Sequence, residues 1–172
     1  MNTNRFKQGD KKPSNTFMAR IFLKLNKVPF LRNTIVFRKW FGKLFHLPLS
    51  CSWNKDFYCS SSNIIIGANV GLADTFILSY APVYIGSNTS FSFRNMIITS
   101  SHDLNDFSTV LAKPIIIGKN VWITSNVTIL PGVTIGDNTI IGAGSIVTND
   151  IPSNVLAAGN PCKVIKSISF NK

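Results

Sequence analysis

The sequence predicts an all-β fold, a parallel β-helix built from hexapeptide repeats. Aliphatic residues stand at every sixth position from 117 to 147, and a small or branched residue follows four positions after each of the first five. A helix face repeats at about 3.6 residues and a strand face at about 2, so this period requires short strands joined by tight corners. Such coils stack and cover one another's apolar faces. The anchors are Ile117, Ile123, Ile129, Ile135, Ile141 and Val147, and their followers are Val121, Val127, Val133, Thr139 and Ser145.

The same period, less regular, begins near residue 63. Its anchors are Ile66, Leu72, Leu78, Ile85, Phe91 and Ile97. The step from the third to the fourth anchor is seven residues, which predicts one inserted residue at 79–82. The step from the sixth anchor to Ile117 is twenty residues, two more than the eighteen of a three-sided coil, so a loop should project around 99–114. With three hexapeptides per coil, the repeats make about four coils.

Two helices are expected before the repeats. Residues 1–13 are polar and basic, and we expect them to form a loose arm. A first helix should begin at Ser14 or Asn15, either of which can cap it, and Pro29 should end it. A second helix should end at Pro48. The apolar sides expected are Phe17, Ile21 and Leu25 in the first helix, and Val36, Phe37, Trp40, Phe41, Leu44 and Phe45 in the second.

Most of the positive charge lies in this leader. Residues 1–58 hold twelve Lys and Arg against two Asp, a net charge of +10, and the remaining residues carry +1. The basic residues of the second helix lie mostly opposite its apolar side, as in an interfacial helix on an anionic membrane. The helix can instead cap the open end of the β-helix or pack on a neighbouring subunit. We favour this second interpretation, because terminal coils need a cap and amphipathic helices usually face a core.

The C-terminal segment, residues 151–172, should fold back as a loop and a final strand, because Pro152 and Pro161 cannot continue a regular central strand. The chain therefore divides into a helical leader (1–58), a β-helix domain (59–150) with the projecting loop, and this closing segment.

The cysteines and the apolar runs bear on the cellular compartment. Cys51, Cys59 and Cys162 fit neither a metal spacing nor a disulfide framework, so we expect reduced thiols in a cytoplasmic protein. No uncharged apolar run reaches 18 residues, so no transmembrane helix is expected. Basic residues interrupt the N-terminal apolar stretch, which argues against a removed signal peptide.

The stretch from 114 to 166 resembles the hexapeptide-repeat acyltransferases, above all the sugar and surface-polysaccharide O-acetyltransferases. It reads PIIIGKNVWITSNVTILPGVTIGDNTIIGAGSIVTNDIPSNVLAAGNPCKVIK. The resemblance implies a left-handed β-helix, a homotrimer, and sites for acetyl-CoA and an acceptor between adjacent prisms. It implies acetyl-CoA as co-substrate and no metal.

His102 is the expected general base. Acetylating a hydroxyl from a thioester requires a base for the hydroxyl proton, and imidazole titrates close enough to neutral pH. The chain has one other histidine, His46, which lies in the leader without an evident partner. His102 opens the projecting loop in ITSSHDLND, and the family's catalytic histidine matches this position. Asp103 is expected either to orient the imidazole or to bind the acceptor.

Other site residues are assigned with less direct support. Asp74 and Asp106 are candidates for holding sugar hydroxyls, although aspartates in turns often have only a structural role. The resemblance places a second set along the acetyl-CoA groove: Trp122, Ser125, Ala143, Thr148, Ala158, Asn160 and Lys163. Lys163 and Lys166 are expected to pair with cofactor phosphates. Thr124 stands where relatives often have glycine, which would crowd the groove or add a hydroxyl.

The sequence therefore favours an acetyl-CoA-dependent O-acetyltransferase acting on a sugar, in a capsule, O-antigen or exopolysaccharide precursor. Peripheral contact with the inner face of the membrane is a further expectation. A small non-glycan acceptor, such as serine or an antibiotic, and a non-catalytic β-helix scaffold remain alternatives. A zinc enzyme of the γ-carbonic anhydrase type needs three histidines per metal, and the repeats hold one. The basic leader contains no recognisable nucleic-acid recognition module.

Overall fold

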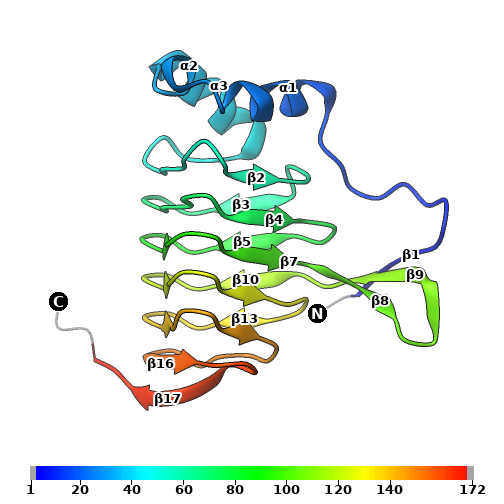
Figure 1. Cartoon of the computed structure of the whole chain (residues 1–172), viewed down its shortest axis with the longest axis vertical. Coiled ribbons are helices and arrows are strands. Elements are labelled where there is room, and N and C mark those ends of the chain that lie inside the picture. The colour runs from blue at the N-terminus through cyan, green and yellow to red at the C-terminus, as the bar shows by residue number, and fades with distance from the viewer. Residues whose placement is uncertain (1–2, 170–172) are drawn as a thin grey trace.

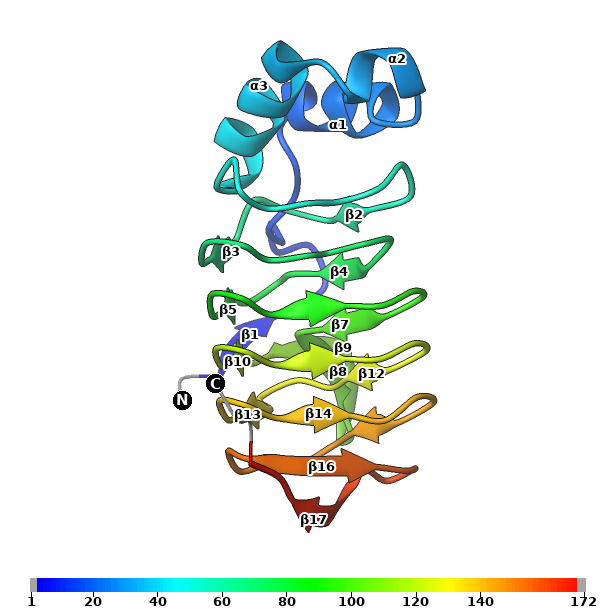
Figure 2. The same ribbon diagram turned by 90° about the vertical axis from the view of Figure 1, so that its left-hand side faces the viewer.

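The computed structural model describes residues 3–169 and shows a tall three-sided prism with helices at one end (Figure 1, Figure 2). Each turn of the chain adds one short strand to each of three parallel sheets, which form the faces of a left-handed parallel β-helix. We number the faces in chain order. The first corner joins the first and second faces, the second corner joins the second and third, and the third corner leads to the next coil.

The strands are short and lie in register along each face. The first face holds β3 (Ile64–Ile66), β5 (Val83–Ile85), β10 (Ile115–Ile117) and β13 (Thr134–Ile135). The second holds β6 (Ser90–Phe91), β11 (Trp122–Ile123), β14 (Ile140–Ile141) and β16 (Val155–Ala158), with β17 (Lys163–Ser167) antiparallel at its edge. The third holds β2 (Tyr58–Cys59), β4 (Phe76–Leu78), β7 (Met96–Ile98), β12 (Thr128–Ile129) and β15 (Ile146–Val147).

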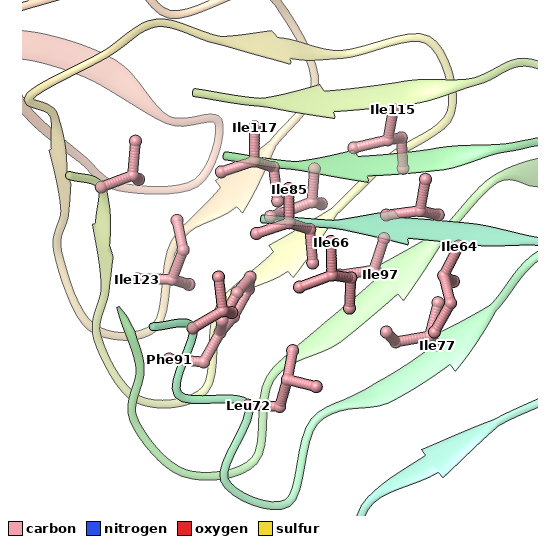
Figure 3. Close-up of a cluster of buried hydrophobic side chains, with 14 of the residues drawn as sticks. Ile64, Ile66, Leu72, Ile77, Ile85, Phe91, Ile97, Ile115, Ile117 and Ile123 are labelled. Carbon is pink, nitrogen blue, oxygen red and sulfur yellow. The ribbon is translucent and has the colours of Figure 1, made fainter. Parts of the chain in front are cut away.

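The hexapeptide anchors stack inside the prism, and most are fully buried. The three columns are Ile66, Ile85, Ile117 and Ile135 on the first face, Phe91, Ile123 and Ile141 on the second, and Ile77, Ile97, Ile129 and Val147 on the third. Figure 3 shows several of these side chains filling one shared interior. The prediction of four coils is confirmed, and partial coils lie above and below them.

One predicted anchor is wrong. Ile77, not Leu78, lies in the third-face column beside Ile97, and it is fully buried whereas Leu78 is half-buried. The step from Leu72 to Ile77 is therefore five residues and the step to Ile85 is eight. The second corner of this coil is one residue shorter than in a regular hexapeptide, so the buried position moves from Leu78 to Ile77. The third corner that follows is two residues longer.

An asparagine ladder runs down the first corner. Its five members all have positive φ, between 55° and 61°, which asparagine tolerates better than other residues with a Cβ. The side-chain amides of the first four donate to the side-chain carbonyl of the asparagine in the next coil, over 3.0–3.3 Å. The members are Asn69, Asn88, Asn120, Asn138 and Asn154. The ladder therefore pins the corner in its left-handed conformation and joins successive coils.

Asn120→Ala is expected to destabilise the fold by about 1–3 kcal/mol, because it forces a Cβ residue without a local hydrogen bond into φ 55° and breaks two rungs. Asn120→Gly keeps the conformation and loses only the rungs, so it should lie between the wild type and the alanine variant. Urea unfolding of the three proteins measures both contributions. Equal stability of wild type and Asn120→Ala would show that the ladder contributes nothing.

The first helix, α1 (Phe17–Leu25), begins later than expected. Thr16 caps it by accepting from the Ala19 N–H at 3.2 Å, so the expected cap at Ser14 or Asn15 is wrong. The helix contacts the prism through Ala19 and Leu23, whereas Phe17 is 77% exposed, contrary to its predicted inward position. The stripe that faces the core therefore runs through positions 19 and 23, on the side away from Phe17.

The second predicted helix is divided. Pro29 opens the short α2 (Pro29–Arg32), and α3 (Ile35–Phe45) follows after Thr34 caps it. The buried stripe of α3 is Phe37, Phe41 and Phe45; Val36 and Trp40 are exposed, which corrects their predicted inward position.

These helices lie over the first coil, and their aromatic side chains continue its core. Phe41 stacks on Trp53 with ring centroids 4.9 Å apart. The Trp53 indole donates to the Asn26 side chain at 3.0 Å, and the Arg38 guanidinium lies 4.5 Å from the Trp53 ring centre. Over residues 3–169, none of the helices has the length and apolar character needed to cross a membrane.

A β-hairpin projects from the third corner, where the sequence predicted a loop (Figure 1). It consists of β8 (Ser100–Asp103) and β9 (Asp106–Ala112). The chain returns to it from the N-terminus, because β1 (Asn4–Phe6) pairs antiparallel with the outer edge of β9. The expectation of a loose N-terminal arm is therefore wrong for these residues.

Candidate active site

His102 lies in β8, on the hairpin that stands out from the prism. Its Nδ1 donates to the Phe107 carbonyl across the hairpin at 2.7 Å. In the neutral imidazole this bond places the proton on Nδ1 and leaves the Nε2 lone pair free. The side chain is exposed, so Nε2 is accessible to a hydroxyl. The hairpin therefore presents a base in the required tautomer.

Asp103 does not hydrogen-bond to His102. Its carboxylate pairs with Arg5 of β1 at 2.5 Å and accepts from the Asn105 N–H at 3.0 Å. Asp103 therefore does not orient the imidazole directly, because adjacent residues of a strand point to opposite sides. The other expected role, binding of the acceptor, stays a prediction. Asp103 ties the N-terminal strand to the hairpin instead. The sequence analysis missed Arg5, because nothing in its local pattern shows that the N-terminus pairs with residues a hundred positions away.

Asp106 and Asp74 have structural partners. Asp106, at the hairpin turn, accepts from the Ser108 and Thr109 hydroxyls, and these bonds hold the pKa of its carboxyl below its usual range. Asp74 lies at the second corner and accepts from the Arg94 N–H at 2.6 Å. The hairpin leaves the prism from the third corner, so the structure does not bring Asp74 to the His102 of the same chain.

Most of the residues predicted for the cofactor lie around the second corner. Ser125 and Ala143 occupy this corner in successive coils, where the Gly144 N–H donates to the Ser125 carbonyl at 3.0 Å. Ala158 ends β16 one coil further on, and Asn160 and Lys163 follow it. The structure therefore gathers these small side chains into one column with an exposed lysine at its end.

Trp122 lies on the second face beside this column and is 49% exposed. Its indole donates to the Ser92 hydroxyl at 3.2 Å, which ties the ring to the preceding coil. Thr124 is half-buried, and its hydroxyl donates to the Ile141 carbonyl at 2.6 Å, so it adds no free donor to the groove.

Thr148 lies apart from that column, at the third corner. It lines a hollow of about 640 Å³ together with Lys113, Gly132 and Asp150. Lys113 directly follows the hairpin strand β9, so this hollow lies at the base of the hairpin that holds His102.

The predicted site residues thus fall at two corners of the same prism. His102 and Thr148 belong to the third corner, and Ser125, Ala143 and Ala158 belong to the second. The width of the third face separates them within one chain. They can meet only where the corner of one prism lies against another.

The cysteines are free and buried, as expected of structural thiols. Burial raises the pKa of the Cys59 thiol to about 11 and raises the pKa values of Cys51 and Cys162. Within residues 3–169, His, Cys, Asp and Glu form no group of three or more that could hold a metal ion.

Comparison with known proteins identifies the repeats. Residues 114–149 match the bacterial transferase hexapeptide family (six repeats). The galactoside O-acetyltransferase of Escherichia coli K12 is 44% identical over 120 residues, which are 66% of this chain and 58% of that protein. The chain spans about three fifths of the length of that protein and of a putative acetyltransferase of Saccharomyces cerevisiae, which is 46% identical over 119 residues.

Two solved structures share the fold over most of both chains. A maltose O-acetyltransferase from Clostridium difficile 630 superposes with a TM-score of 0.81 at 33% identity, covering 89% of this chain and 86% of that one. A galactoside acetyltransferase in complex with coenzyme A gives a TM-score of 0.72 at 32% identity, covering 88% and 80%. The similarity includes the helical leader as well as the repeats, because both alignments extend well beyond residues 114–149.

Proposed function

Because this chain belongs to the hexapeptide-repeat acetyltransferase family, we propose that it transfers an acetyl group from acetyl-CoA to a sugar hydroxyl. One observation carries the proposal: the Nδ1–H of His102 is held by the Phe107 carbonyl, so Nε2 is free on an exposed hairpin. In this reaction Nε2 takes the proton of the attacking hydroxyl, and the imidazolium returns a proton to the departing sulfur. Acetyl-CoA supplies the activated acetyl thioester.

The second corner has the features that a pantetheine arm requires. Ser125 and Ala143 leave room for close approach, and Trp122 offers an apolar ring beside them. Lys163 and Lys166 of β17 are exposed and can pair with phosphates as point charges. We assign Thr148, Ala158 and Asn160 to the same track, with Thr148 contributed from the third corner of a second subunit.

The complete site is formed between subunits of a homotrimer. This arrangement places the third corner and hairpin of one prism against the second corner of its neighbour, which brings the two sets of site residues together. The hairpin tip supports it, because Leu104 and Phe107 are 85% and 73% exposed. Large apolar side chains at the end of a projecting hairpin are stabilised when another surface covers them.

A double variant, Leu104→Asp and Phe107→Asp, is expected to shift the protein from trimer to monomer and to lower kcat/KM at least tenfold. The Phe107 carbonyl that holds His102 is backbone and remains. Sedimentation velocity gives the oligomeric state, and Val36→Asp, at an equally exposed position on α3, is the control. A wild type that sediments as a monomer yet turns over would exclude the shared site.

The acceptor class follows from the similar proteins, which are named for galactoside and maltose. We assign a sugar hydroxyl, in a precursor of a capsule, O-antigen or exopolysaccharide. A small non-glycan acceptor is the alternative within the same chemistry, and a non-catalytic scaffold is the alternative outside it.

The test is acetyl-CoA turnover against a panel of sugars and surface-glycan precursors, read as release of free thiol. The three protein thiols are buried, so a thiol reagent should report CoA with little background. Turnover with a sugar supports the proposal, and turnover only with serine or an antibiotic supports the alternative acceptor. If the wild type does not bind acetyl-CoA, the enzyme interpretation is wrong and the non-catalytic scaffold becomes the favoured interpretation.

The helical cap also presents a surface suited to an anionic membrane. Phe30 and Trp40 are 76% and 56% exposed there, beside Lys39 and Lys43. No acidic residue occurs between positions 11 and 55. Exposed aromatics with surrounding basic residues bind anionic lipid surfaces. On these features and the free thiols we base the assignment of the protein to the cytoplasmic face of a membrane.

The full chain is expected to float with vesicles that contain anionic lipid and to remain in solution with neutral ones. Phe30→Ser combined with Trp40→Ser should abolish flotation, whereas Phe93→Ser, which removes an exposed aromatic of the prism, should not. Point variants are used because deletion of the helices would expose the apolar core that Phe41 covers, and exposed core could itself bind lipid. A full chain that never floats would rule out membrane contact.

A further inference from the structure

A cleft of about 580 Å³ lies between α1 and the upper part of the third face, outside the site described above. One wall carries Arg20, Lys24 and Lys27 of α1 and the residues that follow it. Tyr58 and Tyr80 line the opposite side. The cleft thus combines basic groups with aromatic rings.

The basic wall follows from helix geometry. Positions 20, 24 and 27 fall on one side of a helix, and this side adjoins the stripe through which α1 contacts the prism. The only carboxylate in the lining is that of Asp56. Among residues 3–169 the single ion pair within 4.0 Å is that of Arg5 with Asp103, so the three cations of this wall have no carboxylate partner. Unpaired like charges that converge on a concave surface attract an anion.

The third face lines the cleft through Tyr58 and Leu78, and its strand β7 leads directly into the hairpin that holds His102. The Tyr80 N–H donates to the Thr99 hydroxyl at 2.8 Å, immediately before the hairpin. The Phe6 ring meets the Tyr80 ring edge-on at 6.2 Å, and Phe6 is separated from His102 by two strand spacings, about 10 Å. An acceptor of several sugar units could therefore extend from the cleft towards the hairpin.

We infer that this cleft is a subsite for the anionic groups of the acceptor, so that the preferred substrate is a glycan bearing carboxylates or phosphates. The inference rests on the proposed function and extends it. Arg20 can hold a carboxylate or phosphate through two parallel hydrogen bonds, and Lys24 and Lys27 add point charges. Tyr58 and Tyr80 offer flat apolar surfaces with hydroxyl groups for the sugar rings.

Binding without acetyl-CoA tests the inference independently of catalysis. The probes for calorimetric titration of the full chain are hexagalacturonate for carboxylates, inorganic pyrophosphate for phosphates, and maltohexaose as the neutral control. We expect an anionic probe to bind at least tenfold more tightly than maltohexaose. Whether hexagalacturonate or pyrophosphate binds more tightly identifies the anion.

The variant Arg20→Gln, Lys24→Gln, Lys27→Gln should lose this preference at least tenfold. The control Lys39→Gln, Lys43→Gln, Lys119→Gln removes the same charge from exposed positions outside the cleft and should bind as the wild type does. Equal loss in both variants, or equal binding of charged and neutral probes by the wild type, would overturn the inference. So would a cleft variant that loses affinity for acetyl-CoA instead. Failure of the wild type to bind acetyl-CoA would contradict the proposed function and not this subsite.

Discussion

His102→Ala is expected to lower kcat/KM for acetyl transfer by about 10²–10⁴-fold while leaving acetyl-CoA affinity unchanged. The imidazole is held in one tautomer by the Phe107 carbonyl, and in the proposed mechanism its free Nε2 takes the hydroxyl proton. Because alanine removes that group without disturbing the β8–β9 ladder, the loss should appear in the chemical step. Steady-state kinetics with thiol release, combined with calorimetric titration of acetyl-CoA, measures both quantities.

Two controls separate the role of the base from structural effects. His46→Ala removes the other histidine, which lies at the end of α3, and should leave turnover unchanged. Asp103→Asn breaks the ion pair with Arg5 and should reduce kcat/KM less than His102→Ala, because the proposed base itself remains. A His102→Ala protein that turns over like the wild type would remove the hairpin from the mechanism.

Gly86→Ala is expected to destabilise the prism by about 2–3 kcal/mol, a large effect for one added methyl group. A Cβ at this first-corner position would lie 2.5 Å from the carbonyl carbon of Gly118 and 2.6 Å from its oxygen. These are backbone atoms of the next coil, so they cannot move aside without opening the parallel ladder between β5 and β10. The expected fall in Tm is roughly 5–10 °C for a chain of this size.

Gly71→Ala is the matched control. A Cβ there would meet only the Ser52 and Ser90 hydroxyl oxygens, at 3.5 and 3.7 Å, which is ordinary contact. It should change Tm little. If the two variants melt alike, close approach at the first corner is not what selects glycine at position 86.

The core could be predicted from the sequence because the hexapeptide period directly encodes the stacking of coils. The six anchors from Ile117 to Val147 all lie buried in the columns that their spacing indicates. The prediction is wrong at Leu78, because the second corner before it is one residue shorter than the others and moves the buried position to Ile77. A six-residue period gives only the average spacing of the anchors. It cannot locate a corner that is one residue short when the following corner is longer.

The asparagine ladder was within reach of the sequence but was missed. Each member stands three residues after a first-face anchor, in the strings IGAN, IGSN, IGKN, IGDN and IPSN. The apolar period drew attention to the positions facing inward. The polar position that sets the corner conformation has its own period, which an analysis of hydrophobicity does not register.

The site was only partly predictable, for two physical reasons. His102 could be singled out because a rare side chain stands where the repeats are interrupted, and its position on the projecting hairpin agrees with the predicted loop. The role of Asp103 was not found, because its partner Arg5 lies 98 residues away and belongs to a strand that the leader composition did not suggest. The cofactor residues lie at two different corners of the prism. Assigning each residue to its corner requires knowing which strand belongs to which face, and the structure supplies this assignment.

The pairing of β1 with β9 has a consequence for biosynthesis. The ribosome releases residues 4–6 well before their partners at 110–112, and at 5–20 residues per second the interval is about 5–20 s. During that time the coils made earlier can stack, but β1 has no partner strand. The hairpin that carries the proposed base therefore gains its outer strand only when residues 4–6, made much earlier, return to it.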